Sequence, residues 1–600
     1  MSLSFDAHQV CVSFEGRPIL RSVCCHFTPG WTHVIGPNGA GKSTWIRVLA
    51  GLICADSGEV TLDCVRVDKL SPLARAEKIA YVPQRLEAVP ELSVLSFVSQ
   101  GTYAWGMRGA EPEQRLDRAR HALRELGISH LASRRLCTLS GGELEMCVLA
   151  SAVAQRAQIL LLDEPTAALD VGYAEVFCRA VRRLVRQGMI VISVTHDLGQ
   201  AARYADRVLV MSGGRIVSDT PSLPSPRILG RVYRADPQVF ARYARASHVH
   251  VRRVRRSAVR PTHRFQMIGI PGHSRQRRRS EATQDTMKGN RALWLALAVT
   301  LCASLVCPWI GATAAFPWDA SREVFWQLRV PRVIWGALSG GVLAVAGSVL
   351  QSLFQNALAT PYTLGLASGA SLGAMLAIQL GFAGIFGLSA ASCAGGILTM
   401  GAVIAISSRL GRYQSLNCLL AGIAASMFCS AAGLVVQAFA TPFTAHQMMR
   451  WQLGGLEVTG YGAFLSVPFI AASLIYLYLS AERLDMMRVD TELAASRGIR
   501  VVRTRALVLL AAGIATSMVV SVCGPIGFIG LIIPHILRRI YGCAMRHLMV
   551  LCALYGAAFL MVADCVSRVL ERFAWIPVGV ITAAIGAPVL VYLIRRKHSV

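Results

Sequence analysis

Hydrophobic and polar positions are arranged differently in the two halves of this chain. Up to about residue 290, charged and apolar residues are mixed as in a globular domain, and apolar strand-like runs lead into helix-periodic segments. Beyond that point, long apolar blocks alternate with short polar breaks. The pattern predicts an α/β domain at residues 1–248, a linker at 249–290 and an all-α polytopic membrane domain at 291–600.

The apolar blocks of the second half have the length of membrane-spanning helices. A bilayer core about 30 Å thick requires roughly 20 apolar residues per helix. Some blocks are short and rich in glycine, as packed transport helices often are. We therefore predict about ten transmembrane helices. Their expected starts lie near Ala292, Val333, Leu364, Ile385, Leu416, Tyr461, Arg505, Ile526, Leu548 and Val578.

Basic residues between these blocks indicate how the helices cross the membrane, because Lys and Arg accumulate in cytoplasmic loops. If the first helix leaves the cytoplasm, the inside loops near residues 409–412, 483–503 and 538–546 are rich in arginine. The outer loops are poorer in basic residues, apart from Arg322, Arg329 and Arg332. We therefore expect a multi-pass protein of the cytoplasmic membrane, with the α/β domain and both termini in the cytoplasm.

The net charge of +27 over 600 residues raises the question of nucleic-acid binding. However, 54% of the residues are hydrophobic and the mean hydropathy is +0.48, which is high for a soluble nucleic-acid binder. The arginine clusters of the linker, at 252–260 and 275–279, lack the interleaved aromatic residues of nucleic-acid binders. We expect no nucleic acid as a partner, and instead a basic linker lying on anionic lipid headgroups.

The string "HVIGPNGAGKSTWIRVLAGL" places a phosphate-binding loop between an apolar strand and a helix. Its glycines allow backbone N–H groups to close around phosphates, and Lys42 adds a positive charge. The Ser43 hydroxyl is suited to hold Mg²⁺. The residues expected to bind ATP here are Gly36, Asn38, Gly39, Gly41, Lys42, Ser43 and Thr44.

Three further motifs follow in order. The string "QILLLDEPTAALD" is a buried strand that ends in Asp163, a candidate Mg²⁺ ligand, and Glu164, a candidate general base. Before it comes "LSGGE", residues 139–143, and after it "VISVTHDL" places His196 at the end of another apolar strand. A lone histidine in that place is usually structural, but the fixed order of four motifs favours a catalytic role.

These motifs resemble those of the ATP-binding cassette (ABC) family over about residues 1–245. The resemblance implies an ATPase with Mg²⁺ in which Phe14 lies under the adenine and His196 contacts the γ-phosphate. It makes Gln84 a Mg²⁺ ligand and the sensor toward the membrane partner. Ser140, Gly141 and Gly142 would contact ATP bound by the other subunit, with Asp170 nearby. The chain departs from the family by Leu144-Glu145-Met146 after "LSGGE", where a Gln and an Arg are common.

The membrane half contains "QNALATPYTLGLASGA", "GPIGFIGLIIPHILR" and "IPVGVITAAIGAPV", which look like permeases of the type II ABC importers for iron chelates and cobalamin. The resemblance implies ten helices per subunit and two subunits around a two-fold axis. It assigns Glu492, Ala495 and Gly498 to the cytoplasmic segment that couples to the ATPase. It also implies that Arg329, Arg332 and Arg568 dock an acidic, extracytoplasmic substrate-binding protein.

We therefore expect a homodimer that imports a ferric siderophore, haem or cobalamin with a separate binding protein. The alternative is an ABC exporter with the ATPase domain first, which would share every nucleotide motif. Exporters of that order carry about six spans and lack the permease strings above. No motif decides among the three substrates.

Overall fold

The computed structural model describes residues 4–167, 169–241, 275–311, 323–382, 385–409, 415–456 and 461–595. It contains two compact units. The first comprises residues 1–279 and 489–501, and the second comprises 280–488 and 502–600. A short segment from the second half of the sequence is thus part of the first unit. The predicted linker lies outside the described residues up to 274, and its second arginine cluster falls on a helix.

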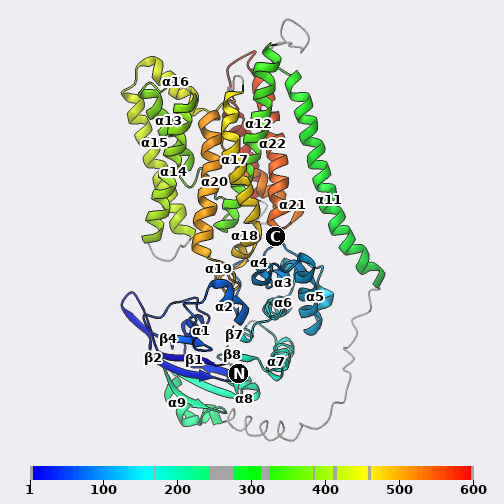
Figure 1. Cartoon of the computed structure of the whole chain (residues 1–600), viewed down its shortest axis with the longest axis vertical. Coiled ribbons are helices and arrows are strands. Elements are labelled where there is room, and N and C mark those ends of the chain that lie inside the picture. The colour runs from blue at the N-terminus through cyan, green and yellow to red at the C-terminus, as the bar shows by residue number, and fades with distance from the viewer. Residues whose placement is uncertain are drawn as a thin grey trace. The chain divides into compact units, whose positions relative to one another are not determined.

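A six-stranded sheet, in the order β10-β9-β3-β8-β7-β6, forms one layer of the first unit (Figure 1). The five strands from β9 to β6 are parallel, and β10 pairs antiparallel to β9. Parallel strands bring their carboxyl ends to one edge, where ligands bind in open α/β sheets. The strands are β3 (Gly30–Ile35), β6 (Ile79–Val82), β7 (Ile159–Asp163), β8 (Ile190–Val194), β9 (Arg207–Ser212) and β10 (Arg215–Thr220).

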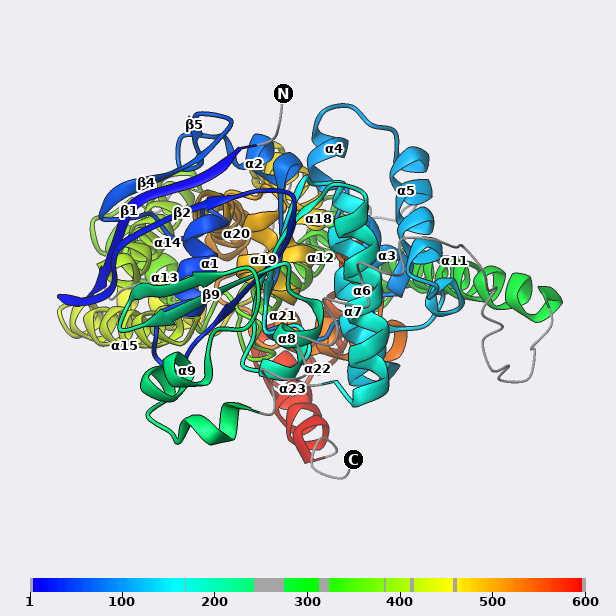
Figure 2. The same ribbon diagram turned by 90° about the horizontal axis from the view of Figure 1, so that it is seen from below.

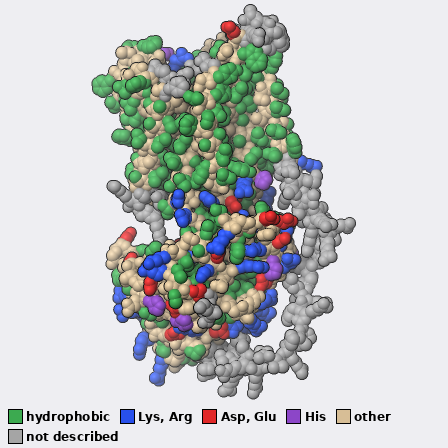
Figure 3. Space-filling model, viewed as in Figure 1, with side chains coloured by type: hydrophobic (Ala, Val, Ile, Leu, Met, Phe, Trp, Pro, Cys, Tyr) green, Lys and Arg blue, Asp and Glu red, His purple; other side chains and the backbone are tan. Residues whose placement is uncertain are grey.

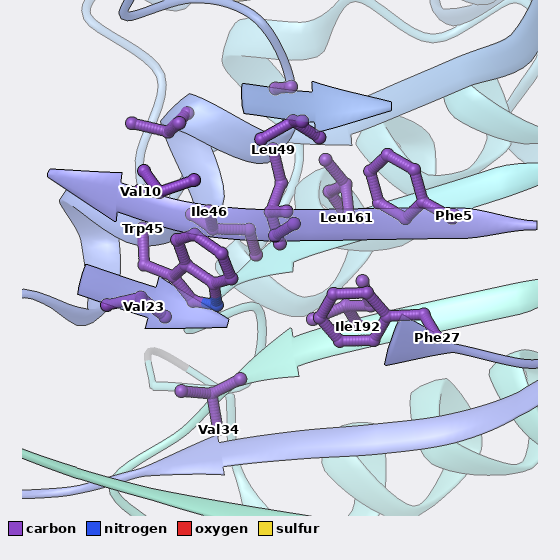
Figure 4. Packing of buried hydrophobic residues seen from close by; sticks show 14 of the residues in the cluster. Phe5, Val10, Val23, Phe27, Val34, Trp45, Ile46, Leu49, Leu161 and Ile192 are labelled. Carbon is purple, nitrogen blue, oxygen red and sulfur yellow. The ribbon is translucent and has the colours of Figure 1, made fainter. Parts of the chain in front are cut away.

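A second, antiparallel sheet has the order β2-β1-β4-β5. One hydrophobic core joins the two sheets (Figure 4). Trp45 and Ile46 of helix α1 are fully buried there beside Phe5 of the small sheet and Leu161 and Ile192 of the large one. This packing fixes the helix that follows the phosphate loop. The elements are β1 (Phe5–Phe14), β2 (Arg17–Phe27), β4 (Ser57–Leu62), β5 (Val65–Arg66) and α1 (Lys42–Leu49).

The remaining helices of the first unit include α6 (Gly141–Gln155) and α7 (Val171–Arg186), which lie side by side (Figure 2). Their N-termini carry the "LSGGE" residues and Asp170. The short helix α19 (Thr491–Ser496) comes from the segment at 489–501. The others are α2 (Pro72–Lys78), α3 (Val94–Gln100), α4 (Tyr103–Met107), α5 (Pro112–Glu125), α8 (Leu198–Tyr204) and α9 (Pro226–Tyr233).

The second unit is all-helical, as predicted, and hydrophobic side chains dominate its visible face (Figure 3). Each of the ten predicted apolar blocks contains a helix, but seven of the described helices are long and apolar enough to cross a membrane. The count of ten spans is therefore not confirmed. Two further apolar helices, Leu366–Gln379 and Val578–Val591, are shorter. The block from Ile526 forms only the 13-residue helix α21 (Ile529–Tyr541), which contains Pro534.

Small residues allow the central helices of this unit to pack closely. A Cβ on Gly347 of α12 would lie 1.8 Å from the Gly530 oxygen of α21, and one on Gly340 would lie 2.2 Å from the Gly556 oxygen of α22. Such contacts are typical of helix packing in lipid. The helices of the unit are α11 (Arg275–Val306), α12 (Val330–Leu353), α13 (Leu366–Gln379), α14 (Ile385–Arg409), α15 (Ser415–Ala438), α16 (Pro442–Gln452), α17 (Val467–Leu479), α18 (Ala481–Val489), α20 (Val501–Cys523), α21 (Ile529–Tyr541), α22 (Met545–Leu570) and α23 (Val578–Arg595).

Candidate functional site

The phosphate-binding loop connects β3 to α1. Gly39 and Gly41 have φ values of 78° and 93°, in the left-handed region that glycine adopts without strain. Lys42 is 6% exposed, and its Nζ donates to the carbonyl oxygens of Gly36 at 2.8 Å and Pro37 at 2.9 Å. Burial lowers the pKa of Lys42, with the Glu164 and Asp163 carboxylates acting in the opposite direction. The first turn of α1 carries no side-chain cap, so its N–H groups are available to bind a phosphate.

The remaining residues predicted around this loop are accessible. Asn38 and Gly39 are exposed, and Ser43 and Thr44 are half-buried. Phe14, at the end of β1, is 40% exposed and therefore is not part of the hydrophobic core. The contact of Phe14 with the adenine ring stays a prediction.

Ser43 and Asp163 form the part of the site that suits Mg²⁺. The Ser43 hydroxyl donates to Asp163 Oδ1 at 3.1 Å, and Asp163 is 1% exposed. Its Oδ2 is buried and has no hydrogen-bond partner among the described residues. Burial raises the pKa of Asp163 to about 6, against the lowering effect of the Ser43 hydrogen bond. A divalent cation would offset the cost of this buried carboxylate, so the donor set fits Mg²⁺.

Glu164 contacts two other residues that were predicted for the site, Gln84 and His196. Gln84 Nε2 donates to Glu164 Oε2 at 2.9 Å, and His196 Nδ1 lies 3.2 Å from the same oxygen. Glu164 has a φ of 49°, which is uncommon for a residue with a side chain, and its N–H donates to the Val194 oxygen at 3.1 Å. The three residues follow β6, β7 and β8, which are neighbours in the sheet. Glu164 and His196 line one pocket, in which a water molecule could be polarised.

The "LSGGE" residues begin α6. Ser140 is its N-cap and forms a reciprocal capping box with Glu143. A Cβ on Gly142 would lie 2.5 Å from the ring of Tyr173, so the ring occupies the space above this glycine. Asp170 caps α7 by accepting from the Tyr173 N–H at 2.8 Å, and thereby places that ring. Tyr173 was not predicted from the sequence.

The segment at 489–501 lies against two elements of the nucleotide site. Glu492 Oε2 is 2.9 Å from Arg47 Nε of α1 and accepts a hydrogen bond from the Tyr81 hydroxyl of β6 at 3.3 Å. Gly498 has a φ of 98°, and a Cβ there would lie 3.0 Å from Leu73 Cδ2. Ala495 is half-buried. The coupling role of these residues stays a prediction.

Arg497 of the same segment is a functional candidate that the sequence reasoning missed. It is 1% exposed and contacts α3 and α6. In the sequence it lies among Arg488, Arg500 and Arg503, and this group was interpreted only as the positive charge expected of a cytoplasmic loop. Helical spacing from Leu493 and Ala494, both buried, was the signal that could have marked its burial.

Two of the arginines predicted to dock a binding protein, Arg332 and Arg568, belong to an internal ion-pair network of the second unit. Arg332 Nε lies 2.8 Å from Asp564 Oδ1, and Arg568 Nε lies 3.1 Å from Asp564 Oδ2. Arg332 also reaches Glu571 at 3.4 Å. Asp564 is 1% exposed. The acidic partners therefore come from this chain itself.

The burial of two of the three residues weighs against a docking role, which stays a prediction. Arg329 and Arg568 are 6% and 4% exposed, and each donates to a backbone carbonyl of the loop after α11, those of Pro308 and Cys307. Buried guanidinium groups cannot present charge to an outside protein. The third residue, Arg332, keeps 18% of its side chain exposed.

Comparisons with known proteins match both halves of the chain. Residues 293–596 match the FecCD transport family, and residues 20–167 match the ABC transporter family. The chain is 36% identical over 282 residues to the uncharacterized ABC transporter permease protein YvrB of Bacillus subtilis, covering 46% of this chain and 80% of that protein.

Two further matches each cover about half of the chain. The vitamin B12 import system permease protein BtuC of Yersinia enterocolitica is 34% identical over 310 residues, covering 51% of this chain and 91% of that protein. A solved chain described as a metal-chelate type ABC transporter in an inward-facing conformation is 28% identical, covering 51% of this chain and 99% of that one, with a TM-score of 0.47.

Proposed function

The chain belongs to the FecCD transport family, and on this premise we propose that two copies of it form an ATP-driven importer in the cytoplasmic membrane. At the level of class, it is an ABC importer of the metal-chelate and cobalamin type, with ATPase and permease in one polypeptide. The observation that carries the proposal is that a FecCD permease half is joined to an ATPase half in which Ser43 contacts Asp163 and Gln84 contacts Glu164. No observation favours the exporter alternative.

The nucleotide site supports hydrolysis as follows. Lys42 and the N–H groups of the loop and α1 bind the phosphates. Ser43 and Asp163 would hold Mg²⁺, which neutralises charge on the phosphates when bound. Gln84 would turn its amide oxygen toward the metal once its present bond to Glu164 opens. Glu164 accepts a proton from the attacking water, and His196 beside it orients the γ-phosphate.

Two partners complete the proposal. Each chain contributes one phosphate loop and one "LSGGE" sequence, so a second copy would supply the missing side of each ATP site. An extracytoplasmic binding protein would deliver the substrate. Arg332 stays a candidate docking residue because its side chain is partly exposed, whereas Arg329 and Arg568 support the fold around it.

The test is transport by the purified chain in proteoliposomes, with the ATPase unit facing outward and ATP added outside. Ferric siderophores, haem and cobalamin would be loaded inside with a candidate binding protein, and release to the outside measured. We expect one of the three to be moved in an ATP-dependent manner. The Lys42→Ala variant, which removes the positive charge that binds the phosphates, is the control and should show no transport. Movement only in the opposite direction would establish an exporter instead.

A further inference from the structure

The segment at 489–501 contains an arginine buried in an environment without acidic partners. The Arg497 guanidinium donates from Nη2 to Ser151 Oγ at 2.8 Å and from Nη1 to Gln100 Oε1 at 3.2 Å. It also lies over the Phe97 ring, 5.0 Å from the ring centre. Within the described residues no carboxylate forms an ion pair with it. The contacts come instead from neutral groups of α3 and α6.

A buried guanidinium group of this kind lowers the stability of the fold unless its neutral hydrogen-bond partners stay in place. Burial lowers the pKa of Arg497 to about 9, with the Asp490 charge acting in the opposite direction, so the group is still a cation at neutral pH. A buried charge must keep its hydrogen bonds, because water cannot replace them. The planar guanidinium fork also fixes direction, which a hydrophobic anchor does not. Arg497 is therefore tied to the positions of Gln100 and Ser151.

Ser151 connects this contact to the nucleotide site. It lies on α6, whose N-cap Ser140 begins the "LSGGE" residues, and α6 runs without interruption from Gly141 to Gln155. Ser151 lies eleven positions along the chain from Ser140, a rise of roughly 16 Å in an α-helix. A rigid helix of this length carries a displacement of its first turn to Ser151. Meanwhile Glu492 pairs with Arg47 on α1, the helix of the phosphate loop. The segment thus contacts α1 of the phosphate loop through Glu492 and α6 of the "LSGGE" sequence through Arg497.

We propose that Arg497 is a positioning residue that fastens the segment at 489–501 to the "LSGGE" helix and passes motion of that helix to α20. Helix α20 begins at Val501, four residues after Arg497, so a displaced guanidinium moves the start of a membrane helix. In this proposal Glu492 moves with α1, the helix of the phosphate loop, and Arg497 moves with α6, the helix that begins at the "LSGGE" residues. The inference rests on the proposed ATP-driven transport, so its test reads ATP hydrolysis separately from motion.

The test uses the full chain in lipid nanodiscs. The variant Arg497→Met keeps an apolar stem of similar length and removes the charge and the hydrogen-bond fork. Its matched control is Arg500→Met, which removes the same charge from an exposed position of the same segment. Ser151→Ala removes the acceptor from the ATPase side and serves if Arg497→Met does not fold. Arg497→Lys, which retains charge and one donor group, is the conservative rescue.

Two readouts separate positioning from a merely structural role. The first is the kcat and KM for ATP, and the second is hydrogen exchange of peptides from residues 502–600 with and without ATP and vanadate. We expect Arg497→Met to keep the KM for ATP but to reduce the nucleotide-dependent change in exchange by about twofold or more. Ser151→Ala should do the same to a smaller extent, and combining the two should add little. Arg497→Lys should restore part of the change, and Arg500→Met should match the wild type.

The outcomes are distinguishable. A wild-type response of the membrane peptides retained in Arg497→Met and in Ser151→Ala would overturn the role of Arg497. Loss of the response together with a raised KM and lower thermal stability would also overturn it, because Arg497 would then only hold the ATPase unit together. Absence of ATP hydrolysis in the wild type would overturn the proposed function itself, and with it this inference.

Discussion

Glu164 is the residue on which hydrolysis depends in the proposed mechanism. Its carboxylate meets Gln84 and His196 at one oxygen, and its backbone is held in an uncommon conformation by Val194. A residue held in this way at the end of a buried strand has little freedom to move away from the γ-phosphate. The neighbouring Asp163, in contrast, is buried and paired to Ser43. Two adjacent carboxylates therefore have different roles.

We expect Glu164→Gln to bind ATP but to hydrolyse it roughly 10²–10⁴-fold more slowly, because the amide keeps the shape and cannot accept the proton. The measurement is ATP turnover beside equilibrium binding of a fluorescent ATP analogue. Lys42→Ala is the control that should lose binding as well. Near-normal turnover by Glu164→Gln would place the general base elsewhere.

Glu145, the departure after "LSGGE", has a buried carboxyl oxygen without a hydrogen-bond partner among the described residues. Burial raises its pKa to about 7, from a usual value near 4.3. Between these values the folded state binds more protons than the unfolded state, so stability falls as pH rises through this window and stays low above it. At lower pH the carboxyl is neutral in both states. The residue thus costs stability at neutral and alkaline pH.

Glu145→Gln should therefore stabilise the ATPase unit at pH 8 by roughly 1–3 kcal/mol, a rise in Tm of roughly 2–4 °C per kcal/mol, and should have little effect near pH 4.5. Thermal unfolding of the full chain across this range is the measurement. Glu113→Gln, on the exposed first turn of α5, is the matched control and should lower stability by at most about 1 kcal/mol, without the gain at high pH. A pH-independent effect of Glu145→Gln would contradict the titration.

At this scale the sequence was sufficient where a motif has a fixed spacing. The phosphate loop, Asp163, Glu164 and His196 lie together as their order along parallel strands requires. Tyr173 could not be predicted, because it acts through a contact that tertiary packing creates. For Arg497, helical spacing could have indicated burial but not its partners Gln100 and Ser151. Arg329 and Arg568 show a different limit, because their charge suggested exposure, whereas both are buried and donate to the carbonyl oxygens of Pro308 and Cys307, 21 and 261 residues away.

Among the elements, α6 and α7 are joined at their first turns. The Tyr173 ring covers Gly142, and Asp170 fixes the ring through the first turn of α7. A displacement of α7 would therefore displace the residues expected to meet the ATP of another subunit. The glycine is required here by the close approach of an aromatic ring.

We expect Gly142→Ala to destabilise the ATPase unit by roughly 1–3 kcal/mol, because the added methyl group overlaps the ring. The double variant Gly142→Ala with Tyr173→Ala should recover much of this loss, which thermal unfolding of both variants would show. Gly39→Ala on the phosphate loop meets no neighbouring atom and is a control for backbone strain alone. Equal stability of the single and double variants would contradict the contact.

In the second unit, α12 and α22 are joined by the ion pairs of Asp564. This carboxylate compensates Arg332 and Arg568, so its removal leaves two guanidinium groups in a buried position. Asp564→Asn should lower the stability of the unit by roughly 3–5 kcal/mol, the usual cost of breaking a buried pair. Glu571→Gln, at the more exposed pair, should cost at most about 1 kcal/mol. Thermal unfolding in detergent would compare them, and equal effects would show that burial does not govern this network.

For the whole molecule, composition and pattern were enough to predict two folded parts of different chemistry. They were not enough to count the spans. The blocks from Leu364 and Val578 form helices of 14 and 18 residues, and the block from Ile526 forms a helix of 13. Apolar runs of 10 to 14 residues are compatible with either a short span or a buried core helix. Hydropathy alone cannot distinguish them, because a helix shielded by its neighbours need not match the bilayer.

A single chain has one phosphate loop and one "LSGGE" sequence, and within the described residues no hydrogen bond joins Ser140, Gly141 or Gly142 to residues 36–44. The proposed dimer resolves this by placing each ATP between two chains. We therefore expect the purified protein to have twice the 64.7 kDa mass of the chain in detergent. Mass alone does not show that the sites are shared, so the decisive measurement is complementation.

Lys42→Ala removes from the phosphate loop the positive charge that binds ATP. Ser140→Arg places a bulky cation in the "LSGGE" sequence and blocks it. Each variant alone should be inactive, since both sites of its dimer carry the defect. When the two are co-expressed, half of the dimers contain one chain of each kind, and each of these has one site with both defects and one intact site. We expect up to roughly a quarter of wild-type ATP turnover in the mixture if chains pair at random. A wild-type chain diluted with Lys42→Ala provides the calibration. An inactive mixture with proven mixed dimers would show either that each chain builds its ATP site alone or that a dimer with one intact site cannot hydrolyse ATP. Activity of Ser140→Arg by itself would show that "LSGGE" is not part of the ATP site.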